Sequence, residues 1–203
     1  MSLANYSDVI ARVKDWSGRS DSSAIADVGI ALTESKVNRY LRVKSMLSKN
    51  ASFTINAEYV AVPTDFGGVK SFYLNTTDTS VLDWMPDELI TNTWQGQTGQ
   101  PQVYGVQGAN FRFGPVPDTS YTATLVYYQK VPALTGSATT NWLITNHPDV
   151  YLYGVMAEAS AAFKDASSAQ AYWQLMYQAL DQLKLASNRD TYSGDGAVFA
   201  RPG

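Results

Sequence analysis

The sequence has no cysteine and only one histidine among its 203 residues. The missing cysteines exclude a disulfide framework and thiolate metal sites, and they fit a reducing compartment. With a single histidine, a metal site would need mostly carboxylate ligands. We therefore expect no metal and no other cofactor.

Long apolar runs and a strong charge imbalance are also missing. No apolar stretch approaches the ~18 residues of a membrane span, and residues 1–5 lack the basic and apolar regions of a signal peptide. A formal net charge of −3 argues against nucleic-acid binding through the overall charge. These absences predict a soluble, unsecreted protein without membrane contact.

Hydrophobic residues make up 45% of the chain, with 13 Tyr and 5 Trp, a load that suits strands and buried protein contacts. In residues 6–16 they recur every three to four positions, which predicts a short helix. The segment 17–20 contains glycine and serine and breaks this pattern. A second helix is predicted from 21 or 22 to about 47, so the N-terminal part is expected to be an αα-hairpin.

The C-terminal half contains two more predicted helices. Pro148 suits the first turn of a helix, with Asn146 or His147 as its cap. Small residues between 148 and 163 permit close helix packing in this segment. The apolar pattern of 169–187 predicts the final helix.

Between these helical segments the apolar period changes to two residues, which is typical of strands. Residues 107–110 predict a hairpin turn, and 86–93 predict a short helix with Pro86 at its start. We expect about five or six antiparallel strands between 51 and 130. The predicted strands lie at 53–55, 59–62, 69–74, 103–106, 111–113 and 121–129.

The predicted fold class is therefore α+β, with a bundle of about four helices, an inserted antiparallel β-domain and an extended C-terminal tail. The chain is expected to be divided into an N-terminal αα-hairpin (1–50), the β-domain (51–130), a return loop with the C-terminal helices (131–188), and the tail (189–203).

The search for catalytic chemistry finds little. His147 lies at a predicted helix start, where a capping or structural role is favoured over catalysis. The densest acidic pair, Asp87 and Glu88, lies where a helix N-terminus favours negative charge. The glycines lack the strand–turn–helix context and the lysine of a phosphate loop. We therefore expect no enzyme activity.

One charge concentration falls on the predicted second helix. It has five basic residues and no acidic residue between 36 and 49. A solvated helix face is the simpler explanation, and the alternative is a surface that meets an acidic protein or the phosphates of packaged DNA. The residues are Lys36, Arg39, Arg42, Lys44 and Lys49.

The tail combines glycine, aspartate and proline with spaced apolar residues. Such a segment can become ordered on a partner, and a frayed terminus is the alternative. The candidate contact residues are Arg189, Tyr192, Val198, Phe199 and Arg201.

The order of these parts resembles the head-to-tail adaptor proteins of tailed bacteriophages, most closely the podovirus-type adaptor with a β-domain between its helices, within the wider head-completion connector family. The resemblance is carried by Val62 to Phe66, Pro101 to Tyr104, Phe111 to Pro117, Leu125 to Tyr128, Asn141 to Leu143, and Pro148 to Gly154.

The resemblance implies a structural protein of the virion, made in the host cytoplasm and located at the head–tail junction. It implies a dodecameric ring of copies that docks beneath the portal protein and holds a tail or nozzle protein. In such families the C-terminal segment reaches into the portal, so residues 189–203 are the implied portal anchor here.

Two other functions are weighed against this one. A carbohydrate- or ligand-binding module would use exposed tryptophans, with Trp84, Trp94 and Trp142 as candidates. A hydrolase is the weakest alternative, because it would need a pair of convergent acids that the sequence does not display.

Overall fold

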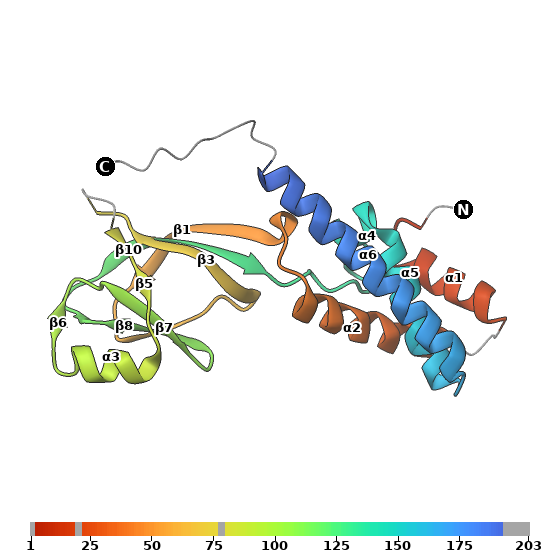
Figure 1. Ribbon diagram of the computed structural model, residues 1–203, viewed down its shortest axis with the longest axis horizontal. Coiled ribbons are helices and arrows are strands. Elements are labelled where there is room, and N and C mark those ends of the chain that lie inside the picture. The colour runs from red at the N-terminus through yellow and green to blue at the C-terminus, as the bar shows by residue number, and fades with distance from the viewer. Residues whose placement is uncertain (1–2, 19–21, 77–79, 193–203) are drawn as a thin grey trace. The chain divides into compact units, whose positions relative to one another are not determined.

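The computed structural model describes residues 3–18, 22–76 and 80–192 and forms two compact units (Figure 1). The first, called the helical unit here, consists of Met1–Ser45 and Val131–Gly203, and the second, the β unit, consists of Met46–Lys130. The β unit is therefore an insertion in the sequence of the helical unit. Helices and antiparallel sheets are both present, which confirms the predicted α+β class.

Five helices lie in the described part of the helical unit. Asn5 caps the first, its side chain accepting a hydrogen bond from the Asp8 N–H at 3.0 Å, and Gly18 ends it with a φ of 64°. Pro148 is the first residue of the helix 148–162, as predicted. The helices are α1 (Tyr6–Ser17), α2 (Ser22–Tyr40), α4 (Trp142–Asn146), α5 (Pro148–Ala162) and α6 (Ala166–Tyr192).

Helix α5 is the centre of the helical unit and contacts each of the other four helices. Its small residues let its neighbours approach closely. At Gly154, an added Cβ would lie only 2.4 Å from Thr33 Cγ2 of α2 and 3.0 Å from Met176 Sδ of α6. The three helices therefore meet at a point where no side chain larger than hydrogen fits without a shift.

A buried polar network fastens the return segment 131–141 to the helices. Glu34 of α2 is 8% exposed. Its Oε1 accepts hydrogen bonds from the Leu134 N–H and from the Tyr151 hydroxyl, each at 2.7 Å. Asn141 Nδ2 donates to the same hydroxyl at 2.7 Å. Burial raises the pKa of Glu34, while the hydrogen bonds from Tyr151 and from the Leu134 N–H lower it.

The β unit contains two four-stranded sheets and one short strand pair. One sheet has the order β1 (Leu47–Ile55), β10 (Tyr121–Gln129), β3 (Phe66–Leu74) and β4 (Ser80–Val81). The other has the order β2 (Tyr59–Ala61), β8 (Asn110–Gly114), β7 (Val103–Gln107) and β5 (Asp83–Trp84), and the pair is β6 (Thr98–Gly99) with β9 (Val116–Pro117).

Strands β1 and β10 join the β unit to the rest of the chain. They are antiparallel neighbours, with Leu47 opposite Tyr128 and Ile55 opposite Tyr121. The chain thus enters and leaves the β unit on adjacent strands.

An aromatic core fills the β unit. Phe53 and Phe72 come from the sheet that contains β1 and β3, whereas Phe111 and Phe113 come from β8 of the other sheet. The rings of Phe72 and Phe111 are 5.3 Å apart between centroids, and those of Phe53 and Phe111 are 5.7 Å apart. The predicted strands 111–113 and 121–129 thus contribute their alternating apolar side chains to this core.

Helix α3 (Asp87–Trp94) packs on β7 and β8 (Figure 1). Two glycines make room for it. An added Cβ at Gly105 would lie 3.0 Å from Ile90 Cδ1, and one at Gly114 would lie 2.7 Å from Trp94 Cδ1. Since side chains alternate along a strand, Arg112 emerges on the same face of β8 as Gly114 and points toward α3.

Several predicted boundaries are wrong. Helix α2 ends at Tyr40 instead of continuing to about 47, and β1 already begins at Leu47, after the short 3-10 helix η1 (Lys44–Met46). The reason is burial: Leu41, Val43 and Met46 are buried while the residues between them are exposed, a pattern that a continuing helix could not satisfy.

The strand count is also wrong, since the described part of the chain has ten strands instead of five or six. The additional strands β4, β5, β6 and β9 are two residues long, too short to show an alternating pattern. Two pairings, β5 with β7 and β6 with β9, are parallel rather than antiparallel.

Candidate functional site

The predicted basic helix face does not form. Only Lys36 and Arg39 lie in α2; Arg42 is in the connection after the helix, Lys44 is in η1, and Lys49 is in β1 of the β unit. The five residues were placed on one face because α2 was predicted to continue to about 47. The helix ends before it can bring them together.

Two of these basic residues are engaged in local structure. Lys36 pairs with Glu158 of α5, and its Nζ lies 4.5 Å from the centre of the Trp173 ring of α6. The Arg42 guanidinium donates to the carbonyls of Asn38 and Leu41 at 2.7 and 2.6 Å, and it thereby supplies hydrogen-bond donors to carbonyl groups at the C-terminal end of α2. Both side chains thus stabilise the helical unit.

The first residues of the predicted tail are helical. Helix α6 continues to Tyr192, so Arg189 is helical and exposed in the last turn, and the residues 189–192 are not extended. No glycine or proline occurs between Gly154 and Gly194, so the sequence has no strong helix stop signal at 188. Val198, Phe199 and Arg201 lie outside the described residues.

His147 occupies the N-cap position of α5 but makes no capping hydrogen bond with its side chain. Its N–H donates to the Leu143 carbonyl at 2.7 Å, and its ring meets Trp142 edge-on at 6.5 Å. Within the described ranges, no cluster of three or more His, Cys, Asp and Glu side chains could hold a metal ion. Nor does any helix there have both the length and the apolar character needed to cross a membrane.

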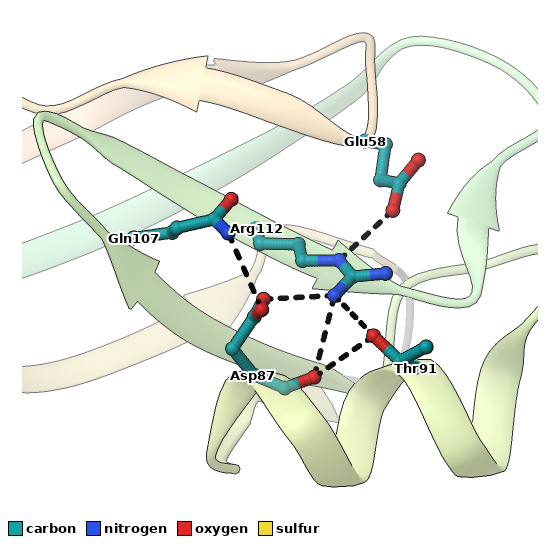
Figure 2. Close-up of polar contacts among 5 residues, drawn as sticks. All are labelled: Glu58, Asp87, Thr91, Gln107 and Arg112. Atoms are coloured by element: carbon teal, nitrogen blue, oxygen red, sulfur yellow. Dashed lines mark hydrogen bonds and ion pairs between the residues drawn. The ribbon is translucent and has the colours of Figure 1, made fainter.

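The most connected polar cluster of the β unit is centred on Arg112 (Figure 2). Its Nε donates to Glu58 Oε1 at 2.9 Å, and its Nη1 donates to Asp87 Oδ1 at 2.8 Å and to Thr91 Oγ1 at 2.7 Å. Gln107 Nε2 adds a donor to the other Asp87 oxygen at 3.3 Å. Strands β7 and β8 are thereby connected to the first turn of α3.

The electrostatics of this cluster favour a structural role. The Arg112 side chain is 11% exposed, and the hydrogen bond to Asp87 is the main cause that raises the pKa of its guanidinium. Two carboxylates for one guanidinium give a net negative cluster, and its hydrogen bonds hold α3 against the sheet.

The three tryptophans proposed as ligand platforms differ in exposure. Trp94 and Trp142 are half-buried. Their indole N–H groups are buried, and neither has a hydrogen-bond partner in the described part of the chain. Trp84 of β5 is 63% exposed. Of the three, only Trp84 presents most of its side chain to a partner.

An apolar groove lies between α2 and α5 in the helical unit. It has a volume of about 420 Å³. Val28 and Leu32, four residues apart on α2, border it and are 60% and 44% exposed. Its one charged lining group, Glu158, is already paired with Lys36. Each unit therefore has exposed apolar side chains of its own.

Sequence reasoning missed Arg112 as the centre of a cluster. Its partners Asp87 and Glu58 are 25 and 54 residues away, so no local pattern joins them. One signal was available: Arg112 ends a long stretch, 71–111, that has no lysine or arginine. A basic residue beside such a stretch is a natural partner for its acids.

Each unit has exposed apolar side chains, a feature typical of proteins that contact other proteins. Residues 4–199 match the family described as SU10 adaptor protein, and the chain belongs to this family. No curated protein matches the chain. The family match confirms the resemblance to phage head-to-tail adaptors and supports a structural role at the head–tail junction of the virion.

Proposed function

We propose that this chain is a non-catalytic adaptor that forms a ring, dodecameric when assembled, beneath the portal protein and joins it to a tail or nozzle protein. In this proposal the C-terminal segment from Arg189 onward anchors the ring on the portal. The protein is made in the host cytoplasm and then incorporated into the virion, where it can touch packaged DNA without reading its sequence.

The observation that carries the proposal is the family match over nearly the whole chain. The fold supports it, because a ring subunit needs separate surfaces for its two neighbours, for the portal and for the tail. Exposed apolar side chains such as Val28 in the helical unit and Trp84 in the β unit offer such surfaces.

The test is electron microscopy of the chain mixed with its cognate portal. A ring of copies beneath the portal is the expected result, and a portal that remains bare would overturn the adaptor role.

The role of the C-terminal segment needs its own variant. Replacing Val198 and Phe199 by serine keeps the chain length and leaves α6 intact. We expect unchanged helix content by circular dichroism and at least tenfold weaker portal docking, on the order of the loss of one well-buried anchor. The matched control replaces Ser193 and Asp195 by alanine and should dock normally. Docking of the serine variant at wild-type affinity would remove the anchor from the proposal.

A further inference from the structure

The segment 80–89 forms one edge of the β unit. Strand β4 is the outermost strand of one sheet, and β5 is the outermost strand of the other. Between them, Leu82 is buried and its N–H donates to the Phe72 carbonyl at 2.9 Å. The segment therefore passes from the edge of one sheet to the edge of the other, and we call it the edge segment.

Large apolar side chains of the edge segment are exposed. Val81 is 64% exposed, Trp84 is 63% exposed, and Leu89 in the first turn of α3 is 51% exposed. Isolated exposed apolar residues are common on protein surfaces, but three within nine residues, on β4, on β5 and in the first turn of α3, are typical of a contact surface.

Strand β5, the outermost of its sheet among the described strands, presents backbone hydrogen-bonding groups on the side away from β7. The N–H groups of Asp83 and Met85 donate to the carbonyls of Gln102 and Tyr104, at 3.0 and 2.9 Å. Because backbone groups alternate in direction along a strand, the N–H and C=O of Trp84 point away from β7. An extended peptide can add to such an edge through main-chain hydrogen bonds.

The charged residues within the edge segment are all acidic. Residues 71–111 contain four acidic residues and no lysine or arginine. Asp83 and Glu88 are exposed, whereas Asp87 is held by Arg112. Of the basic residues that bound this stretch, Lys70 is exposed on β3, and Arg112 is already neutralised within its cluster.

We propose that the edge segment docks an extended, positively charged segment of a partner protein, which adds a strand beside β5 and packs apolar side chains on Trp84. Complementary charge selects the occupant: lysine or arginine side chains of the added strand meet Asp83 and Glu88. This inference rests on the proposed adaptor function only in one respect, namely that the partner protein belongs to the head–tail junction.

The probe for the test is a short peptide that alternates lysine with valine and threonine, labelled for fluorescence anisotropy and titrated with the full chain. Its twin carries glutamate in place of lysine. We expect saturable binding of the lysine peptide, weaker at high salt, and no binding of the glutamate twin. On binding, hydrogen exchange at the Trp84 amide should slow.

The chain contains a matched control for each substitution. Asp15 and Trp16 of α1 are an exposed Asp–Trp pair in the helical unit, just as Asp83 and Trp84 are in the β unit. We expect about tenfold weaker peptide binding for Asp83→Lys and for Trp84→Ala, and no more than about a twofold change for Asp15→Lys and Trp16→Ala.

Several results would overturn the proposal. These are equal weakening by Asp15→Lys, equal binding of the glutamate twin, absence of saturation, and an unprotected Trp84 amide. Self-association that Asp83→Lys abolishes would assign the edge to a second copy instead, and binding of a DNA oligonucleotide there would also refute it. If the chain docks on its portal but the peptide does not bind, only this proposal fails. If the peptide binds but portals stay bare, the adaptor function fails.

Discussion

Replacing Gly154 by alanine perturbs the point where α2, α5 and α6 meet. The new methyl group would lie 2.4 Å from Thr33 Cγ2 and 2.7 Å from its Oγ1, and Thr33 is fully buried, so the helices must move apart. Overpacking of this kind costs about 1–3 kcal/mol, and so close an approach belongs at the upper end. Alanine returns about 1 kcal/mol through its higher helix propensity. We expect a net loss of about 2 kcal/mol.

Removing the opposing side chain should reverse this result. In a Thr33→Ala background the nearest remaining atom to the methyl group of Gly154→Ala is the Sδ of the flexible Met176 side chain, at 3.0 Å. Thr33 Oγ1 has no hydrogen-bond partner in the described part of the chain, so its removal breaks no polar contact. There the substitution should be neutral or stabilise the protein by up to about 1 kcal/mol, which gives a coupling energy of about 2–3 kcal/mol.

The assay is urea unfolding followed by far-ultraviolet circular dichroism, which reports mainly on the helical unit because α3 is the only α-helix described in the β unit. Gly29→Ala is the matched control, since its added Cβ would be 3.1 Å from Val155 Cγ1 and should change the stability by less than about 1 kcal/mol. An equal cost of Gly154→Ala in both backgrounds would refute the steric argument.

Three further predictions concern the polar clusters. Arg112→Met leaves Asp87 without its guanidinium partner and should destabilise the β unit by about 2–3 kcal/mol. Hydrogen exchange of the β7 and β8 amides measures this loss, and Lys70→Met, at an exposed site of the same unit, should change it by less than about 0.5 kcal/mol. Tyr151→Phe removes a buried hydroxyl bonded to Glu34 and should cost about 1–3 kcal/mol in urea unfolding. Burial raises the pKa of Glu34, so its contribution to stability is present below the unfolded pKa and is lost as the pH rises through the folded pKa. The unfolding free energy of wild type minus that of Glu34→Gln should therefore fall as the pH rises above the unfolded glutamate pKa of about 4.3, and a flat difference would contradict it.

Local patterns predicted the parts of the fold that depend on local physics. The alternation around Phe111 and Phe113 identified a strand because those side chains fill the core, and Pro148 marked a helix start through its fixed φ. The hairpin turn predicted at 107–110, between two strand patterns, does connect β7 with β8, and Gly108 in it has a φ of 61°. In each case the signal and its cause lie within a few residues.

The missed features depend on residues far apart in the chain. Nothing near Tyr40 ends a helix; α2 stops there because Leu41 and Val43 are both buried in the folded unit. The parallel pairing of Asp83 with Val103 joins strands too short to have a pattern of their own. Trp84 was one of three candidate exposed tryptophans, and its position on a sheet edge depends on that pairing and could not be predicted.

The pairing of Leu47 with Tyr128 has an evolutionary consequence. Because the chain enters and leaves the β unit on hydrogen-bonded neighbours, the unit is attached through a two-stranded stem whose ends are close together. Segments attached in this way tolerate replacement, since the host chain needs only the stem to stay paired. Because β1 and β10 also contribute Phe53 and Leu125 to the aromatic core, a replacement for the rest of the unit would have to pack against these two strands.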